Sequence, residues 1–274
     1  MERKEAVRGA YRLTGSNSFY DGMITCSTPV GKAVCRLVWD MNRAECDDYL
    51  EKALSGIPED FSGKLLEVPV GTGILTMPLY RTLPGAEVTC LDYSPDMMRQ
   101  AREKAERLKL SNVSFRQGDV GALPFADGSY DAVLSLNGFH AFPDKEAAYR
   151  ETFRVLKPGG MFLICNESGG DRAADEKWTE RIGGMTIYRD TQLRDMLEQA
   201  GFRDVEIHKI QKGWLCVLAR KSRGSKAMEI LQCKLVQYLR AAPRNSARSL
   251  RQDFCPNSKF GKRRNPVCIS GFSN

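Results

Sequence analysis

A glycine-rich turn follows the first predicted strand, in the segment EVPVGTG that runs from Glu67 to Gly73. Glycine adopts positive φ without strain and lets a ligand approach the main chain, so Gly71 and Gly73 suit a turn that holds a cofactor at a helix N-terminus. The same pattern also occurs in α/β proteins whose glycines serve packing only. The turn is therefore a candidate binding loop whose role depends on what lies near it.

Two carboxylates follow the next two predicted strands. Asp92 comes about 20 residues after the turn, where a carboxylate can accept hydrogen bonds from both hydroxyls of a ribose or, alternatively, can partner the helix that begins near Ser94. Asp119 precedes the apolar segment 123–125, which suits an adenine ring, although a surface turn could have the same composition. Because parallel strands end at a common edge, the convergence of these segments favours a nucleotide-like ligand.

The elements that must position these residues alternate along the chain. Strands are expected at 64–70, 86–91, 112–116, 130–136, 160–165, 203–209 and 213–219, and helices at 73–82, 95–109, 144–156 and 190–200. This alternation predicts an α/β fold with a doubly wound parallel sheet. Only residues 210–212 separate the last two strands, so these two should form an antiparallel hairpin at one edge.

Several segments resemble the class I S-adenosylmethionine-dependent methyltransferases, particularly the small-molecule group that includes the ubiquinone/menaquinone-biosynthesis C-methyltransferases. They lie between residues 60 and 220: EVPVGTG at 67–73, LDYSPDMM at 91–98, QGDVGALPF at 117–125, YDAVLSLNGFHAFPD at 130–144 and RVLKPGG at 154–160. The last two are the most specific. The resemblance implies a seven-stranded Rossmann-like methyltransferase sheet with an antiparallel terminal strand and an N-terminal helical lid.

The same resemblance implies S-adenosyl-L-methionine as the cofactor. The residues that it assigns to the cofactor are Glu67, Gly71 and Gly73 for the methionine part, Asp92 for the ribose with Tyr93 beside it, Asp119 and Val120 for the adenine, and Asn137 near the sulfonium. One position departs from the family pattern, because Pro69 replaces the first of three alternating glycines. Proline fixes φ at about −65° and removes an N–H, so we expect altered loop geometry but not loss of binding.

Two residues are candidates for the methyl-transfer step. His140, just beyond the fourth strand, could act as a base because histidine titrates near neutral pH, or it could only shape the pocket. Tyr20 belongs to the segment that forms a lid in relatives, and it could touch the site or fill the core beneath that lid. Trp178 and Tyr188 could form a substrate wall or belong to the core.

Charge divides the chain near residue 220. Residues 220–274 hold 13 Lys and Arg against two acidic residues, whereas the first 219 residues hold 28 basic and 32 acidic ones. We expect an N-terminal helical cap over 1–60, a methyltransferase domain over 61–220 and a basic C-terminal tail over 221–274. The tail could attract the phosphates of RNA or anionic lipid, but a solvated, disordered extension is favoured because no nucleic-acid module accompanies the charge.

Composition excludes several classes of protein. The 274 residues are 42% hydrophobic and 27% charged, with 24 Gly and 12 Pro, unlike collagen, a coiled coil or a wholly disordered chain. No stretch approaches the roughly 20 apolar residues that span a bilayer, and the first residues lack the apolar core of a signal peptide. The nine cysteines include no CxxC pair, so neither a metal site nor a disulfide framework is expected and a reducing cytoplasm is favoured.

The favoured function is transfer of a methyl group from S-adenosylmethionine to a small-molecule acceptor, mainly by binding, orientation and desolvation. The segment 137–140 supports it, because Asn-Gly-Phe-His replaces the Asn/Asp-Pro-Pro-aromatic motif of nucleic-acid amine methyltransferases. Three alternatives stay open: an RNA methyltransferase that uses the tail, a nicotinamide-binding Rossmann protein and a non-catalytic cofactor-binding relative. No motif indicates the acceptor atom or the oligomeric state.

Overall fold

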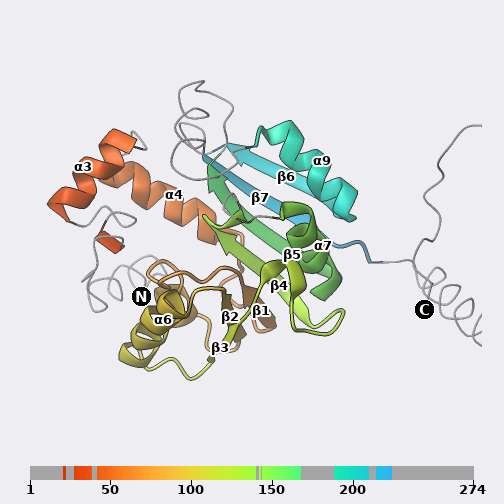
Figure 1. The fold of residues 1–274 in the computed structure, drawn as a ribbon, viewed down its shortest axis with the longest axis horizontal. Helices are drawn as coiled ribbons and strands as arrows, with labels where there is room; N and C mark the ends of the chain where they lie inside the picture. The colour runs from red at the N-terminus through yellow and green to blue at the C-terminus, as the bar shows by residue number, and fades with distance from the viewer. Residues whose placement is uncertain are drawn as a thin grey trace, which may run out of the picture. The chain divides into compact units, whose positions relative to one another are not determined.

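A computed structural model describes residues 21–22, 28–38, 42–139, 142, 144–167, 188–209 and 214–223 (Figure 1). The strands are β1 (Lys64–Glu67), β2 (Glu87–Asp92), β3 (Val113–Gln117), β4 (Tyr130–Leu136), β5 (Leu156–Glu167), β6 (Arg203–Lys209) and β7 (Trp214–Arg220). The helices are α3 (Pro29–Val38), α4 (Arg43–Ser55), α5 (Met77–Tyr80), α6 (Pro95–Arg107), α7 (Lys145–Val155) and α9 (Asp190–Ala200), with a short 3-10 helix η1 (Val120–Ala122).

The strands form one seven-stranded sheet in the order β3-β2-β1-β4-β5-β7-β6. Strands β1 to β5 pair in parallel. Strand β7 is antiparallel to both β5 and β6. The predicted α/β sheet and its antiparallel hairpin at one edge are therefore confirmed.

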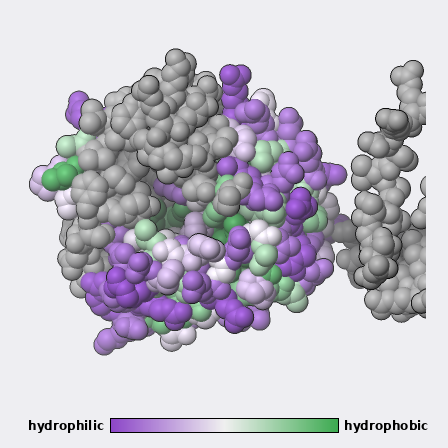
Figure 2. Space-filling model, in the orientation of Figure 1, coloured by the Kyte–Doolittle hydropathy of each residue, from purple (hydrophilic) through white to green (hydrophobic). Residues whose placement is uncertain are grey.

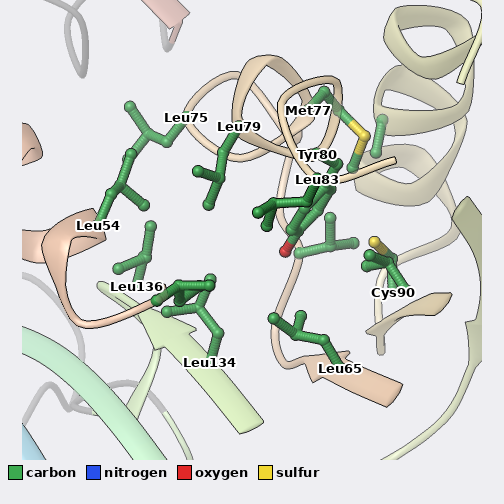
Figure 3. Packing of buried hydrophobic residues seen from close by; sticks show 14 of the residues in the cluster. Leu54, Leu65, Leu75, Met77, Leu79, Tyr80, Leu83, Cys90, Leu134 and Leu136 are labelled. Carbon is green, nitrogen blue, oxygen red and sulfur yellow. The ribbon is translucent and has the colours of Figure 1, made fainter. Parts of the chain in front are cut away.

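The sheet is buried on both faces. Neighbouring residues of a strand point to opposite sides, and in β1 both Leu65 and Leu66 are fully buried. Leu65 and Leu134 face a cluster that includes Leu54 of α4 and, from α5, Met77, Leu79 and Tyr80 (Figure 3). Leu66, the next residue of β1, faces a second cluster with Leu197 of α9. Helices thus cover both faces, and the ends of the parallel strands are left as the edge where loops meet.

The first turn differs from its predicted form. A helix is expected over 73–82, but α5 covers only Met77–Tyr80, and Gly71 and Gly73 have φ of +57° and +68°, which a right-handed helix does not contain. Strand β1 also ends earlier than expected, before Pro69. The N–H groups on either side of this proline still bond to the neighbouring strands, Val68 to β4 and Val70 to β2, so the proline stands where no ladder bond is lost.

The part of the expected N-terminal cap that the structure describes includes the helices α3 and α4. Helix α4 begins with a capping box in which Asn42 and Glu45 bond each other's main-chain N–H, and its buried residue Ala53 belongs to the same cluster as α5.

Among the described residues no helix is long and apolar enough to cross a membrane. Figure 2 shows hydrophobic residues near the middle of one face, with hydrophilic residues toward its borders.

Lys221 fixes the C-terminal end of the domain. Its ammonium donates hydrogen bonds to the carbonyls of Phe153 and Leu156, at 2.8 Å each, where α7 ends. Its main chain bonds Gly159 and Gly160. The chain divides into the units 1–223 and 224–274, so a truncation that tests the basic tail should end after Arg223, not before Lys221.

Candidate functional site

The candidate site begins at the glycine turn between β1 and α5. A Cβ added at Gly73 would lie 2.9 Å from Met77 Cγ and 3.2 Å from Ala101 Cβ, so this glycine allows the turn to pack closely on α6. A Cβ added at Gly71 would meet no heavy atom within 4 Å. Gly73 thus serves packing, whereas Gly71 leaves open space beside the main chain, as a loop that cradles a cofactor requires.

Asp92, at the end of β2, lies against this turn. Its Oδ2 accepts a hydrogen bond from the N–H of Gly71 at 2.8 Å. Its Oδ1 accepts one from the N–H of Ser94, also at 2.8 Å, and Ser94 in turn caps α6. The carboxylate thus orders the start of a helix, as one interpretation of the sequence expects, and it also reaches the glycine turn, whereas its binding of a ribose stays a prediction. Each oxygen keeps a second lone pair, which is what recognition of a ribose diol needs.

The end of β3 lies beside Asp92. The N–H of Gly118 bonds the carbonyl of Asp92 at 3.1 Å. Asp119 is exposed and caps η1 through the N–H of Gly121, at 2.8 Å, whereas Val120 is buried. Tyr93 is 77% exposed, so its ring is free to cover a ligand at this edge. The structure thus brings together the segments predicted to bind ribose and adenine, and their binding roles stay predictions.

Arg154 of α7 holds the loop that follows η1. Its guanidinium donates to the carbonyls of Leu123 at 3.0 Å and Phe125 at 2.7 Å. It also pairs with Glu151 at 2.7 Å and Asp127 at 2.8 Å, and it lowers the pKa of the Glu151 carboxyl by hydrogen bonding. The apolar segment 123–125, predicted to flank an adenine, is therefore fixed to α7.

Asn137 follows β4 in a left-handed conformation, with φ of +52°, which is uncommon for a residue other than glycine. Its N–H bonds the carbonyl of Cys165 at 2.8 Å. Two residues on, Phe139 is 1% exposed and stacks on Tyr149 with ring centroids 4.5 Å apart. The loop that carries Asn137 is thereby held from both sides, which suits a residue that lines a binding site.

Gly138 explains how the chain accommodates Pro69. A Cβ at Gly138 would lie 2.0 Å from Cδ and 2.5 Å from Cγ of the proline ring, so the ring occupies the space that any other residue at 138 would need. Pro69, which stands where the resemblance leads us to expect a glycine, therefore requires a glycine at position 138.

We expect Gly138→Ala to destabilise the protein by about 1–3 kcal/mol, because the methyl group overpacks this contact, and to weaken cofactor binding by displacing the loop. Denaturant unfolding and calorimetric titration would measure the two effects. Gly121→Ala is the matched control for the unfolding measurement, since its Cβ would make ordinary contacts at 3.4 Å and beyond. Adding Pro69→Gly to Gly138→Ala should restore stability; a double variant as unstable as the single one would contradict the assignment.

Glu67 is directed into the core beneath the turn. It is 1% exposed, and its Oε2 accepts a hydrogen bond from the Tyr80 hydroxyl at 2.8 Å and lies 3.5 Å from the Cys90 sulfur. Tyr80 and Cys90 lie among the leucines of the cluster in Figure 3. Burial raises the pKa of the Glu67 carboxyl to about 8. The assignment of Glu67 to the methionine part of the cofactor stays a prediction.

A buried ion pair, absent from the sequence-based assignment, supports the same turn. Asp21 Oδ1 accepts a hydrogen bond from the hydroxyl of Thr72 at 2.6 Å. Asp21 Oδ2 lies 2.7 Å from the ammonium of Lys104, and these two side chains are 2% and 3% exposed. Asp21 therefore ties the N-terminal segment to the residue between the two glycines and to α6. Lys104 carried a signal, because it lies three residues after Ala101 on the apolar face of α6.

Several candidate residues lie outside the described part of the chain. These are the two candidates for the transfer step, His140 and Tyr20, and the wall residue Trp178. Tyr188, the other predicted wall residue, is described, and the ammonium of Lys145 lies 5.6 Å from its ring centroid. Its role in binding a substrate stays a prediction.

Comparisons with known proteins agree with this arrangement. Residues 65–160 match a family model described as a methyltransferase domain. A demethylmenaquinone methyltransferase of Thermus thermophilus is 45% identical over 101 residues, which cover 37% of this chain and 46% of that protein. An arsenite methyltransferase of Halobacterium salinarum is 34% identical over 130 residues, covering 45% of this chain and 33% of that protein. The aligned part thus spans less than half of each relative.

The fold has solved counterparts. An S-adenosylmethionine-dependent methyltransferase from Aquifex aeolicus superimposes with a TM-score of 0.55 at 22% identity, over 74% of this chain and 99% of that one. The sheet order, the antiparallel hairpin and the convergent strand ends define a Rossmann-like methyltransferase fold. Together with the matched family model, they show that residues 65–160 form a methyltransferase domain that is similar in sequence to the methyltransferases named above.

Proposed function

We propose that this protein transfers a methyl group from S-adenosylmethionine to a small-molecule acceptor. The observation that carries the proposal is the contact between Asp92 and Gly71, which joins the carboxylate at the end of β2 to a turn with open space beside its main chain. A dinucleotide turn would want glycine at the position of Thr76, so the geometry favours a single nucleoside with an amino-acid group over a nicotinamide dinucleotide.

The residues of this chain bind and orient. Asp92 accepts hydrogen bonds from the ribose hydroxyls, and the main chain at Gly71 holds the methionine part, while Gly73 lets the turn pack on α6. Asp119 accepts a hydrogen bond from the adenine, while Val120 gives it an apolar wall. Asn137, held by the carbonyl of Cys165, lines the site where the methyl group leaves. The cofactor supplies an activated sulfonium methyl group, so the protein's task is in-line placement of the acceptor and exclusion of water.

The acceptor is a small organic or metalloid molecule in this proposal. The two relatives described above are named for a demethylated quinone and for arsenite, so the shared domain is compatible with acceptors of different chemistry, and the acceptor atom is left unassigned. His140 takes a proton from the acceptor where one must be lost, and Tyr20 contacts the site from the N-terminal segment. We propose a cytoplasmic location, in keeping with nine cysteines and no CxxC pair.

The test is calorimetric titration of S-adenosylmethionine, S-adenosylhomocysteine and NADH into the full chain. We expect the two sulfur compounds to bind with micromolar affinity and NADH not to bind. Asp92→Ala should weaken their binding by roughly 10- to 100-fold, because hydrogen bonds to a charged group contribute about 1.5–3 kcal/mol.

Asp96→Ala is the matched control, since it removes an exposed carboxylate from the same segment and should leave the affinity unchanged. Binding of NADH alone would overturn the proposed function. Equal affinities for Asp92→Ala and the wild type would reject the assigned role of Asp92.

A further inference from the structure

Two cysteine side chains meet across β5 and β7, apart from the residues assigned to the cofactor. Cys165 and Cys216 are direct partners in the antiparallel register, and their sulfur atoms lie 2.7 Å apart. Cys165 is 1% exposed, and its sulfur lies 3.9 Å from the carbonyl of Ala53 in α4. Cys216 is only partly buried. One residue of the pair is therefore enclosed, and the other is only partly buried.

The main chain already holds these residues at a separation that a disulfide requires. Residues directly opposite each other in an antiparallel pair have Cα atoms about 4.5–5.5 Å apart, and disulfides form at Cα separations of about 4.4–6.8 Å. Both side chains project to the same face of the sheet, toward the cluster that contains Leu163 and Ala53. A bond between the sulfurs thus needs no movement of either strand.

We propose that Cys165 and Cys216 are a redox-active dithiol that hydrogen peroxide converts to a cross-strand disulfide. Nothing in the methyl-transfer function requires this pair, so the proposal is independent of that function. Two observations support the proposal: Cys165 and Cys216 are direct partners in the register of β5 and β7, and their thiols are in contact although they lie 51 positions apart in the sequence.

Exposure sets the order of the two steps. Burial raises the pKa of the Cys165 thiol, which keeps Cys165 protonated and slow to react. The Cys216 thiolate therefore attacks the peroxide, the O–O bond breaks, and Cys216 becomes a sulfenic acid while one water leaves. The Cys165 sulfur then attacks the Cys216 sulfur, the S–O bond breaks, and the hydroxyl leaves as a second water with the Cys165 proton. Two thiols are oxidised and one peroxide is reduced to two waters.

The test treats the reduced full chain with hydrogen peroxide, alkylates the thiols that are left, digests the protein and identifies peptides by mass spectrometry. We expect a linked pair of peptides that contain Cys165 and Cys216. Its mass should be lower than that of the two reduced peptides by two hydrogen atoms, and a reductant should release the two peptides from each other. The thermal midpoint of unfolding should rise on oxidation, because the bond constrains the unfolded chain.

Cys216→Ser is the main variant and Cys165→Ala is the second. If one of the two variants does not fold, the other still tests the proposal. Both should lose the linked pair and the shift in thermal midpoint. Cys90→Ala is the matched control, since Cys90 contacts Glu67 and lies outside the pair, and it should keep both. Recovery of Cys165 and Cys216 as alkylated thiols after oxidation would overturn the proposal. So would Cys216 linked to another cysteine, or oxidised to a sulfinic acid beside a free Cys165.

Discussion

Replacing Lys104 with methionine is expected to lower the free energy of unfolding by about 3–5 kcal/mol. The ammonium lies 2.7 Å from the carboxylate of Asp21, and both side chains are almost fully buried. Methionine fills a similar volume but removes the positive charge that faces the buried carboxylate, while the Thr72 hydroxyl still donates a hydrogen bond to it. Urea unfolding of the full chain, followed by circular dichroism, would measure the loss.

A double-mutant cycle separates the ion pair from simple packing. Adding Asp21→Ala to Lys104→Met also removes the buried carboxylate that has lost its ammonium, so the double variant should be more stable than the sum of the two single losses predicts. Strictly additive losses would contradict a direct interaction. The matched control is Arg99→Met on the same helix, which breaks an exposed pair with Glu103 and should cost less than about 1 kcal/mol.

The same variant should also weaken cofactor binding. Thr72 lies between the two glycines of the turn, and Asp21 holds its hydroxyl. When Lys104 is lost, the carboxylate and the turn that it fixes become free to rearrange, so we expect a larger dissociation constant for S-adenosylhomocysteine in Lys104→Met than in Arg99→Met. Equal affinities in the two variants would limit the role of the ion pair to stability.

The sheet was predictable because its signals are local. Each strand is a short apolar run between helices, and the three-residue connection 210–212 left the last two strands no way to pair except as a hairpin. The prediction of a helix over 73–82 was wrong for an equally local reason. Gly73 has positive φ and packs on α6, and the sequence-based expectation weighed the apolar pattern of this segment more than its glycine.

The candidate site was predictable to a smaller extent. Asp92 and Asp119 were predicted because they lie at the ends of strands, and the ends of parallel strands share an edge, whereas Asn137 was assigned only through the resemblance to the methyltransferases. The partners of buried polar groups were not found, because they come from distant parts of the chain. The position of Lys104 on the apolar face of α6 was a signal that the sequence analysis did not use, and only the folded chain shows that Asp21 meets it. The match between Pro69 and Gly138 likewise joins two loops that no sequence pattern connects.

Stability should depend on pH through Glu67. Burial raises its pKa from 4.5 to about 8 in the folded protein. Below pH 4.5 the carboxyl is protonated in both states. Between pH 4.5 and 8 the unfolded chain has lost this proton while the folded protein keeps it, so the contribution of Glu67 to stability falls as pH rises, by about 1.4 kcal/mol per unit at most. Above pH 8 the carboxyl is ionised in both states and the contribution is constant.

Glu67→Gln is expected to remove this dependence. The amide stays neutral at every pH, and its oxygen can still accept the hydrogen bond of Tyr80. Relative to the wild type, the variant should therefore gain stability between pH 5 and pH 8, by a few kcal/mol in total. Denaturant unfolding at several pH values would measure the difference, and Glu103→Gln, which removes an exposed carboxylate, is the matched control. A difference between wild type and Glu67→Gln that stays constant over this interval would mean that the buried carboxyl is already ionised at neutral pH.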